Sequence, residues 1–139
     1  MIPALDISTS GLVAQRTRMD AIAGNLANIS TTHNEHGEAA PYQPRFVVFQ
    51  TDESIGGNGA AGVRVSSVEI EKSEPRLHYD PGHPDAIREG PNQGYVAYPN
   101  INMMSEFTDA LQAARAYEAN LGAIDISKDI EQQTLKILA

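Results

Sequence analysis

The residues most able to do chemistry are four histidines. His33 and His36 stand three apart, and His78 and His83 follow later in the chain. Imidazole nitrogens at such a spacing can bind zinc. All four lie in segments rich in Asn, Gly and Pro, however, so solvated side chains on loops are the simpler interpretation. We therefore predict neither a metal site nor a cofactor.

Carboxylates form a second candidate site. Glu69, Glu71 and Glu74 follow one another closely, and Asp52 and Glu53 precede them. Oxygen ligands of this kind bind calcium, but the sequence lacks the loop pattern of an EF-hand. Exposed strand faces explain the three glutamates more simply.

The remaining motifs do not favour catalysis. The Gly-rich stretch at 56–59 lacks the Lys-Ser/Thr pair of a phosphate-binding loop, and no serine stands in a G-x-S-x-G elbow. The chain has no cysteine, which excludes thiolate metal ligands, a thiol nucleophile and a disulfide framework. Asn28-Ile29-Ser30 fits a glycosylation sequon, but ending a helix is its simpler role. We predict that the chain is not an enzyme.

Charge and hydropathy restrict the function further. The 139 residues carry 18 acidic and 10 basic side chains, for a net charge of −8. Nucleic-acid binding needs clustered Lys and Arg, so the five tyrosines are expected to pack in a core or an interface rather than stack on bases. No uncharged apolar run is long enough to span a membrane as a helix. The start of the chain also lacks the basic and apolar blocks of a cleaved secretion signal.

Composition divides the chain into three parts that must position these side chains. Residues 33–99 hold seven of the eight prolines and eight of the eleven glycines, whereas both ends carry apolar residues at heptad spacing. The pattern predicts an α+β fold. Long N- and C-terminal helices form a coiled-coil-like layer, and a small β-rich domain is inserted between them in the sequence. The expected divisions are 1–32 for the N-terminal helix, 33–99 for the β-rich domain and 100–139 for the C-terminal helix.

Each terminal segment carries two apolar columns that form a helical seam. The N-terminal columns are Leu5, Leu12, Met19, Leu26 and Ser8, Gln15, Ile22, Ile29. The C-terminal columns are Met103, Ala110, Tyr117, Ile124, Glu131, Leu138 and Phe107, Ala114, Leu121, Lys128, Leu135. The first helix is expected to end within 28–32, where Asn, Ser and Thr compete for backbone hydrogen bonds. The last is expected to begin after an N-cap at Asn100 or Asn102.

The length of the C-terminal helix raises two alternatives. A helix over 102–138 would be roughly 55 Å long, against roughly 37 Å for the N-terminal one. About a third of its seam must therefore find a partner elsewhere, or the helix must break near Gly122. An intramolecular helical hairpin in an ordinary α+β domain remains open. Packing between chains is favoured, because the seams continue to both chain ends.

Short runs of β-branched and aromatic residues predict four strands between the helices. The runs are 46–49, 63–70, 77–79 and 95–98. Apolar and polar residues alternate along 63–70, and the alternation shifts by one residue at Ser66-Ser67, which predicts a β-bulge. The glycines of 56–59 predict a hairpin tip or loop. Four such strands are expected to make one small sheet.

Three blocks of sequence resemble one known family. ALDISTSGLVAQRTRMDAIAGNLANISTT at 4–32 is similar to the N-terminal signature of the bacterial flagellar axial proteins, centred on Asn25-Leu26-Ala27-Asn28. PYQPRFVVFQ at 41–50 resembles the segment that follows it in basal-body rod members. GYVAYPNINMMSEFTDALQAARAYEANL at 94–121 resembles their C-terminal signature, including the R-x-Y-x-x-N pattern of Arg115, Tyr117 and Asn120. Together the blocks cover 67 of the 139 residues in the expected order.

The resemblance implies a structural subunit of the proximal rod of the flagellar basal body. Such subunits pass through the flagellar type III export apparatus without a cleaved signal peptide and assemble in the periplasm into a hollow drive shaft. That shaft transmits motor torque and forms part of the export channel. The implied partners are other rod proteins, including FlgB and FlgF, and further copies of the same chain. Neither nucleic acid nor a direct membrane span is implied.

The seams and the resemblance together predict an assembly interface. Its expected residues are Leu5, Leu12, Met19, Ile22, Asn25, Leu26, Asn28, Ile29, Phe107, Leu111, Ala114, Arg115, Tyr117, Asn120, Leu121 and Ile124. The alternative function is a cytosolic helical adaptor or export chaperone, which would bind one client rather than polymerise.

Overall fold

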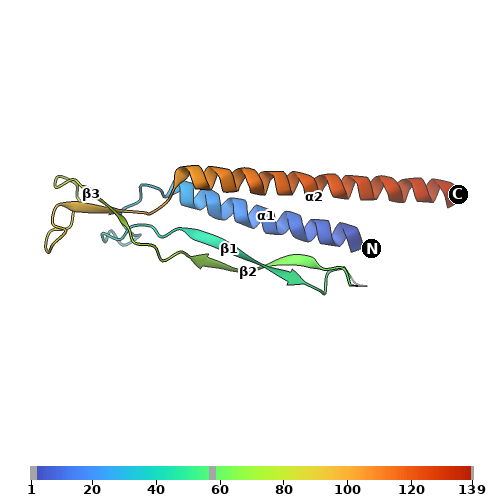
Figure 1. Cartoon of the computed structure of the whole chain (residues 1–139), viewed down its shortest axis with the longest axis horizontal. Helices are drawn as coiled ribbons and strands as arrows, with labels where there is room; N and C mark the ends of the chain where they lie inside the picture. The colour runs from blue at the N-terminus through green and yellow to red at the C-terminus, as the bar shows by residue number, and fades with distance from the viewer. Residues whose placement is uncertain (1–2, 57–58, 139) are drawn as a thin grey trace.

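The computed structural model describes residues 3–56 and 59–138 as an elongated molecule (Figure 1). Helix α1 spans Pro3–Ala27 and helix α2 spans Met103–Leu138, and the two lie side by side and antiparallel. The start of α1 and the end of α2 therefore lie at the same end of the molecule, where α2 extends beyond α1. Neither helix contains a stretch apolar enough to cross a membrane. The expected α+β arrangement of two terminal helices around a β-rich segment is confirmed.

Side-chain amides mark two of the helix ends. The Asn28 side chain donates to the Gly24 carbonyl (2.9 Å) just after the last residue of α1, which confirms the predicted end of that helix. The Asn102 side chain accepts hydrogen bonds from the backbone N–H groups of Met104 (3.0 Å) and Ser105 (3.3 Å). Asn102 is therefore the N-cap of α2. Helix α2 continues through Gly122, so the alternative of a break there is wrong.

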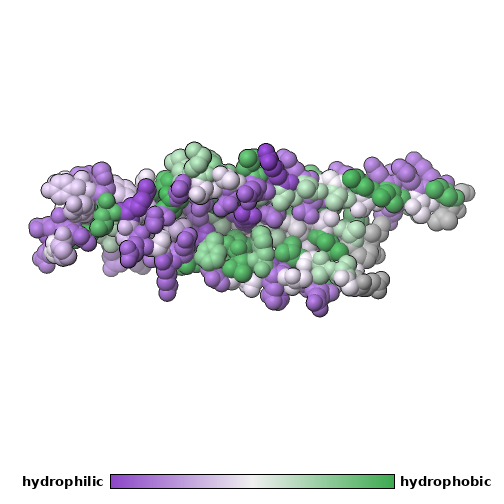
Figure 2. All heavy atoms as spheres, in the orientation of Figure 1, coloured by the Kyte–Doolittle hydropathy of each residue, from purple (hydrophilic) through white to green (hydrophobic). Residues whose placement is uncertain are grey.

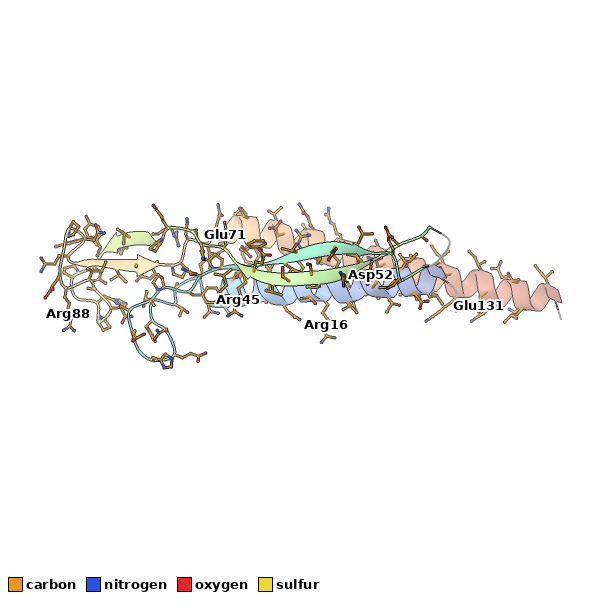
Figure 3. All side chains as sticks on the ribbon, turned by 90° about the horizontal axis from the view of Figure 1, so that it is seen from below. Arg16, Arg45, Asp52, Glu71, Arg88 and Glu131 are labelled. Carbon is orange, nitrogen blue, oxygen red and sulfur yellow. The ribbon has the colours of Figure 1, made fainter. Side chains whose placement is uncertain are left out.

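A long antiparallel hairpin lies along α1. Strand β1 spans Arg45–Asp52 and strand β2 spans Gly62–Ile70. Val48 pairs with Ser67 and Phe49 pairs with Val65, so Ser66 is an extra residue and the predicted bulge is confirmed. Figure 3 shows the hairpin beside α1, with Arg45 and Glu71 at one end and Asp52 near the other. Residues 57 and 58 of the predicted Gly-rich tip lie outside the described residues.

The other two strands form a second sheet. Strand β3 spans Arg76–Tyr79 and pairs antiparallel with strand β4, which spans Tyr95–Tyr98. The prediction of a single four-stranded sheet is therefore wrong. After the Glu71 N–H donates to the Pro44 carbonyl (2.8 Å), the chain runs through Pro75, which has no N–H to continue the ladder. This stretch leads β3 away from the first hairpin to the far end of the molecule (Figure 1).

The buried apolar residues are few and lie in two places. Ala14, Ile22 and Ala113 are buried where α1, α2 and the first hairpin meet, and Val96 and Ile101 are buried around β4. Ala113 has no exposed surface and Ala14 is 1% exposed, so the helices approach each other through small side chains. The core is thus a narrow seam, and much of the apolar surface of α2 remains uncovered.

Candidate assembly interface

Helix α2 packs against α1 through residues that adjoin one predicted column. Ala113 is buried, and Glu106 and Asn120 are half-buried against α1, whereas Phe107 and Leu121 of the predicted column are exposed. A close helix crossing accepts alanine more readily than phenylalanine or leucine. The column of Phe107, Ala114 and Leu121 thus lies beside the contact with α1, and its contact with a neighbouring chain stays a prediction.

The close crossing is tightest at a glycine. A Cβ atom on Gly11 would lie 2.8 Å from Oδ1 of Asn120, which is too short for any ordinary contact. The Asn120 amide in turn donates to the Ala116 carbonyl of its own helix (2.8 Å). The absence of a side chain at Gly11 therefore makes room for Asn120.

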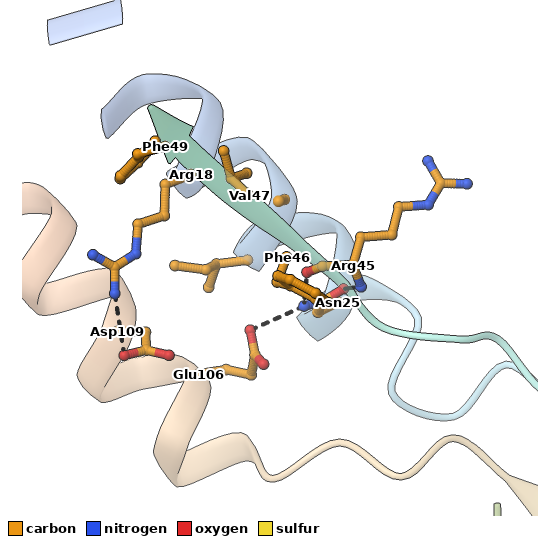
Figure 4. Close-up of a pocket in the computed structure, with 10 residues that line it drawn as sticks. Arg18, Asn25, Arg45, Phe46, Val47, Phe49, Glu106 and Asp109 are labelled. Atoms are coloured by element: carbon orange, nitrogen blue, oxygen red, sulfur yellow. Dashed lines mark hydrogen bonds and ion pairs between the residues drawn. The ribbon is translucent and has the colours of Figure 1, made fainter. Parts of the chain in front are cut away.

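Asn25 joins three separate segments of the chain. Its Nδ2 group donates to the Arg45 carbonyl (2.9 Å) and to Glu106 Oε2 (3.2 Å), and its Oδ1 accepts from the Arg45 N–H (2.8 Å) and the Tyr42 hydroxyl (3.2 Å). The residue is only 3% exposed. Figure 4 shows Asn25 between the start of β1 and the first turns of α2. Asn25 therefore links α1, the start of β1 and the start of α2 within one subunit.

Charged side chains line a groove of about 250 Å³ next to Asn25. Arg18 and Asp109 form an ion pair across it at 3.4 Å, and the aromatic ring of Phe46 lies on its wall (Figure 4). Burial raises the pKa of the Glu106 carboxyl above its ordinary value, the hydrogen bond from Asn25 opposes that shift, and the charge of Asp109 adds to it. The start of α2 is thus tied to α1 by polar contacts rather than by a continuous apolar seam.

The hairpin is fastened to α1 at a second point. The Ser10 hydroxyl accepts a hydrogen bond from the Val63 N–H (3.0 Å) and donates to the Ile7 carbonyl (2.6 Å). A Cβ atom on Gly62 would lie 2.8 Å from the Ser10 hydroxyl, so only glycine permits this approach. Ser10 and Val63 lie 53 positions apart, so no local sequence pattern predicts this hydrogen bond.

The structure separates the sixteen predicted assembly residues by exposure. Two are buried within the subunit: Ile22 and Asn25. Ten are half-buried: Leu5, Leu12, Met19, Leu26, Asn28, Ile29, Ala114, Tyr117, Asn120 and Ile124. Four are exposed: Phe107, Leu111, Arg115 and Leu121. Only the exposed group and the outer surfaces of the half-buried group are available to a neighbouring chain.

Sequence reasoning missed several large apolar residues that the structure exposes. They are Met104, Ile126, Ile130 and Ile137, all on α2. Figure 2 shows apolar residues reaching the surface along α2 and over the β1–β2 hairpin. The i, i+4 spacing of Ile126 and Ile130 was a usable signal, but these residues fall outside the heptad columns on which the prediction depended.

Two of the four histidines contact a carboxylate rather than only solvent. Asp85 Oδ2 accepts from the Thr32 hydroxyl (2.6 Å) and lies 3.3 Å from Nδ1 of His33, while Nδ1 of His83 accepts from the Asp85 N–H (3.1 Å). The Thr32 hydrogen bond is the main cause that lowers the pKa of Asp85, and His33 adds to it. The prediction of freely solvated loops is corrected for His33 and His83, which join the loops after α1 and after β3. His36 and His78 are exposed, as are Glu69, Glu71 and Glu74.

These groups do not assemble a metal centre in the part of the chain that the structure describes. Across residues 3–56 and 59–138, no set of three His, Asp or Glu side chains is arranged to hold an ion. The Asp85 cluster is a contact between loops, held by hydrogen bonds with Thr32 and His83.

Comparison with known proteins identifies relatives over nearly the whole chain. The family described as "Flagella basal body rod protein" matches residues 5–33, and the family described as "Flagellar basal body rod FlgEFG protein C-terminal" matches residues 92–137. The flagellar basal-body rod protein FlgC of Borreliella burgdorferi is 38% identical over 99% of this chain and 97% of its own length. FlgC of Bacillus subtilis is 37% identical over 96% of this chain and 95% of its own, and FlgC of Salmonella typhimurium is 34% identical over 99% and 97%.

Proposed function

This chain belongs to the family of flagellar basal-body rod proteins FlgC, and from that premise we propose which of its surfaces assemble and in what setting. The chain is a structural subunit of the flagellar basal-body rod, and it assembles with other proteins of that rod. The proposed setting is the proximal rod, where the chain forms part of a hollow drive shaft that transmits motor torque and encloses part of the export channel. The proposed role involves no catalytic step.

One observation carries the proposal. Helix α2 uses a single face to pack against α1, while large apolar residues elsewhere on it remain exposed, Met104 by 73% and Ile137 by 84%. Large apolar side chains exposed along one helix indicate a surface that binds a partner. Because α2 carries only one Gly and no Pro along 36 residues, it can present that surface as one straight element. The two helices are the proposed inner layer of the shaft, and residues 33–99 are the proposed outer, β-rich domain.

The partners and route follow from the same premise. FlgB, FlgF and further copies of this chain are the proposed neighbours in the rod. The flagellar type III export apparatus is the proposed carrier, and it delivers the chain to the periplasm without removal of a signal peptide. The sixteen predicted interface residues stay candidates in this scheme, except that Ile22 and Asn25 act within the subunit.

Purified basal bodies provide the test. A strain that lacks this chain is complemented with an epitope-tagged copy, and basal bodies are isolated and labelled with gold. We expect label at the rod and restored swimming, and mass spectrometry should find the intact N-terminus. Complete rods in the deletion strain would refute the rod assignment. Retention of the tagged chain in the cytosol, bound to one client, would favour the export chaperone instead.

A further inference from the structure

The sheet of β3 and β4 stands apart from the other helices and strands. It lies at the opposite end of the molecule from the end of α2, and Arg88 lies in the loop between its strands (Figures 1 and 3). Within the described residues, β3 and β4 approach each other, but neither lies close to α1, α2 or the first hairpin. Residues 76–98, which comprise both strands and the loop between them, are called the distal lobe here. The distal lobe is held to the rest of the subunit by its two connections and by contacts between loops.

The distal lobe is a rigid unit by itself. Strands β3 and β4 pair along their whole length. The loop between them adds two backbone hydrogen bonds, from the Ile87 N–H to the Tyr95 carbonyl and from the Gly94 N–H to the Ile87 carbonyl, both 2.9 Å long. Asp85 stands two residues before Ile87, and its own N–H donates to Nδ1 of His83 (3.1 Å). The Asp85 carboxyl therefore moves with the distal lobe.

The segment that Asp85 contacts belongs to the other rigid unit, which contains the helices and the first hairpin. The Thr31 N–H donates to the Asn28 carbonyl (3.1 Å), and the Thr31 carbonyl accepts from the Tyr42 N–H (3.0 Å). These bonds tie the segment both to the end of α1 and to the stretch that enters β1. Thr32, the next residue, is only 6% exposed. The Thr32 hydroxyl is therefore held in place relative to α1.

One carboxyl joins the two units. Asp85 Oδ2 accepts from the Thr32 hydroxyl at 2.6 Å and lies 3.3 Å from Nδ1 of His33. The Asp85 side chain is 16% exposed, so this charge-assisted hydrogen bond is largely sheltered from water. Among the described residues, the side-chain hydrogen bonds that link the distal lobe to the segment between α1 and β1 all end on this carboxyl.

The two connections of the distal lobe lie together at its base. Arg76 Nε donates to the Pro99 carbonyl (3.2 Å), which holds the connections side by side. Pro99 and Ile101 of the second connection are buried, whereas residues 71–75 of the first are mostly exposed. A solvent-open hollow of about 560 Å³ lies beside this base, between the end of α1 and the distal lobe. The base thus has a fixed side, a mobile side and space for movement.

We propose that the hydrogen bond between Thr32 and Asp85 is a latch that sets the angle of the distal lobe, and that the lobe reorients about its base when this bond is broken. The structure shows the latched state. In the released state both side chains bond to water, while the sheet of the lobe, the helices and the first hairpin keep their structure. The latch belongs to the isolated subunit and does not depend on the proposed rod function. A load on the lobe would change its angle before it deforms the helices.

The chain contains no cysteine, so the angle of the distal lobe can be measured with spin labels. Cysteines at the exposed positions Arg16 and Arg88 place one label on α1 and one on the lobe (Figure 3). Pulsed electron paramagnetic resonance then gives the distribution of distances between them. Thr32→Val removes the latching hydroxyl and keeps the shape of the side chain. Thr31→Val is the matched control, because the Thr31 hydroxyl donates to Asn28 of its own segment (3.1 Å).

We expect a narrow distance distribution in the wild-type chain and in Thr31→Val, and a distribution at least twice as wide in Thr32→Val. Labels at Arg16 and Gln50, both outside the distal lobe, should give one narrow distribution in all three chains. An unchanged width in Thr32→Val, or a broad distribution already in the wild-type chain, would overturn the proposal. Equal widening in both variants would also overturn it, because the Thr32 hydroxyl would then have no special role.

Two variants of the acceptor test the same bond from the other side. Asp85→Ala removes the acceptor and should widen the distribution as Thr32→Val does, and the double variant should be no wider than either single one. Asp85→Asn keeps an oxygen that can accept from Thr32, so its distribution should stay narrow. Widening in Asp85→Asn equal to that in Asp85→Ala would refute the latch.

Amide hydrogen exchange separates reorientation of the distal lobe from its unfolding. In Thr32→Val, the amides that pair β3 with β4 and the amides of Ile87 and Gly94 should exchange within about twofold of their wild-type rates. Loss of this protection, with the β1–β2 hairpin still protected, would show that the lobe unfolds instead of reorienting, and the proposal would fail.

Discussion

Replacement of Asn25 by leucine should destabilise the subunit, not only its assembly. The substitution removes four hydrogen bonds, to the Arg45 N–H and carbonyl, the Tyr42 hydroxyl and the Glu106 carboxylate. A buried polar group left without its partner costs about 1–3 kcal/mol. The half-buried Tyr42 and Glu106 side chains can turn to water, so most of the cost comes from the Arg45 backbone. We expect a loss of about 2–4 kcal/mol in the free energy of unfolding, or a fall of roughly 10 °C in thermal midpoint.

Chemical denaturation of the purified chain measures this loss against two matched variants. Asn28→Ala removes only local bonds at the end of α1 and should cost about 1 kcal/mol or less. Glu106→Gln keeps an oxygen that can accept from Asn25, and it removes a carboxylate whose ionised form the fold disfavours, because its pKa is raised. Its stability at neutral pH should therefore equal or slightly exceed that of wild type. An Asn25→Leu variant no less stable than Asn28→Ala would show that the three-way junction does not hold the subunit together.

Three further changes probe other parts of the structure. Gly11→Ala should lower stability by about 1–2 kcal/mol despite the better helix propensity of alanine, because its Cβ would meet Asn120, and adding Asn120→Ala should reverse the loss in the same denaturation assay. The hydrogen bond from Thr32 lowers the pKa of Asp85 below its ordinary value, so the contribution of Asp85 to stability is full above that ordinary value and is lost as the pH falls through the lower folded-state pKa. Thermal midpoints recorded from about pH 6 to 2 should therefore show less acid destabilisation in Asp85→Asn than in wild type. Leu121→Asp, at a position 46% exposed, should change unfolding by less than about 0.5 kcal/mol while reducing swimming in soft agar; equal effects on both would contradict this.

The helices and strands could be predicted closely because their signals are local. The heptad columns predict both helices, and Asn28 and Asn102 mark two of their ends through hydrogen bonds to nearby backbone groups. The phase change at Ser66-Ser67 likewise predicts the bulge, because strand alternation has a period of two and one extra residue shifts it. Each of these features depends on residues within a few positions of one another.

The contacts between elements could not be predicted in the same way. The Asn25–Glu106 bond joins residues 81 positions apart, and Thr32 and Asp85 are separated by 53. Whether Phe107 or Glu106 faces α1 depends on how closely the two helices approach, which the clearance at Gly11 decides. Heptad spacing alone allows either residue to face α1. The second sheet was missed for a related reason, since alternation shows which segments are strands but not which strands pair.

The two fastenings of the β1–β2 hairpin have a mechanical consequence. Asn25 holds the base of β1 and Ser10 holds the start of β2, and these helix residues stand about 22 Å apart along α1. A hairpin attached to α1 at one point could rotate about that point in every direction. A hairpin attached at two points can rotate only about the line that joins them. A sideways load on the hairpin is therefore resisted by a pair of opposed forces on α1, with a lever arm of most of the helix length. The hairpin thus stiffens α1 against bending. With only one of the two contacts, the hairpin would be free to pivot on α1.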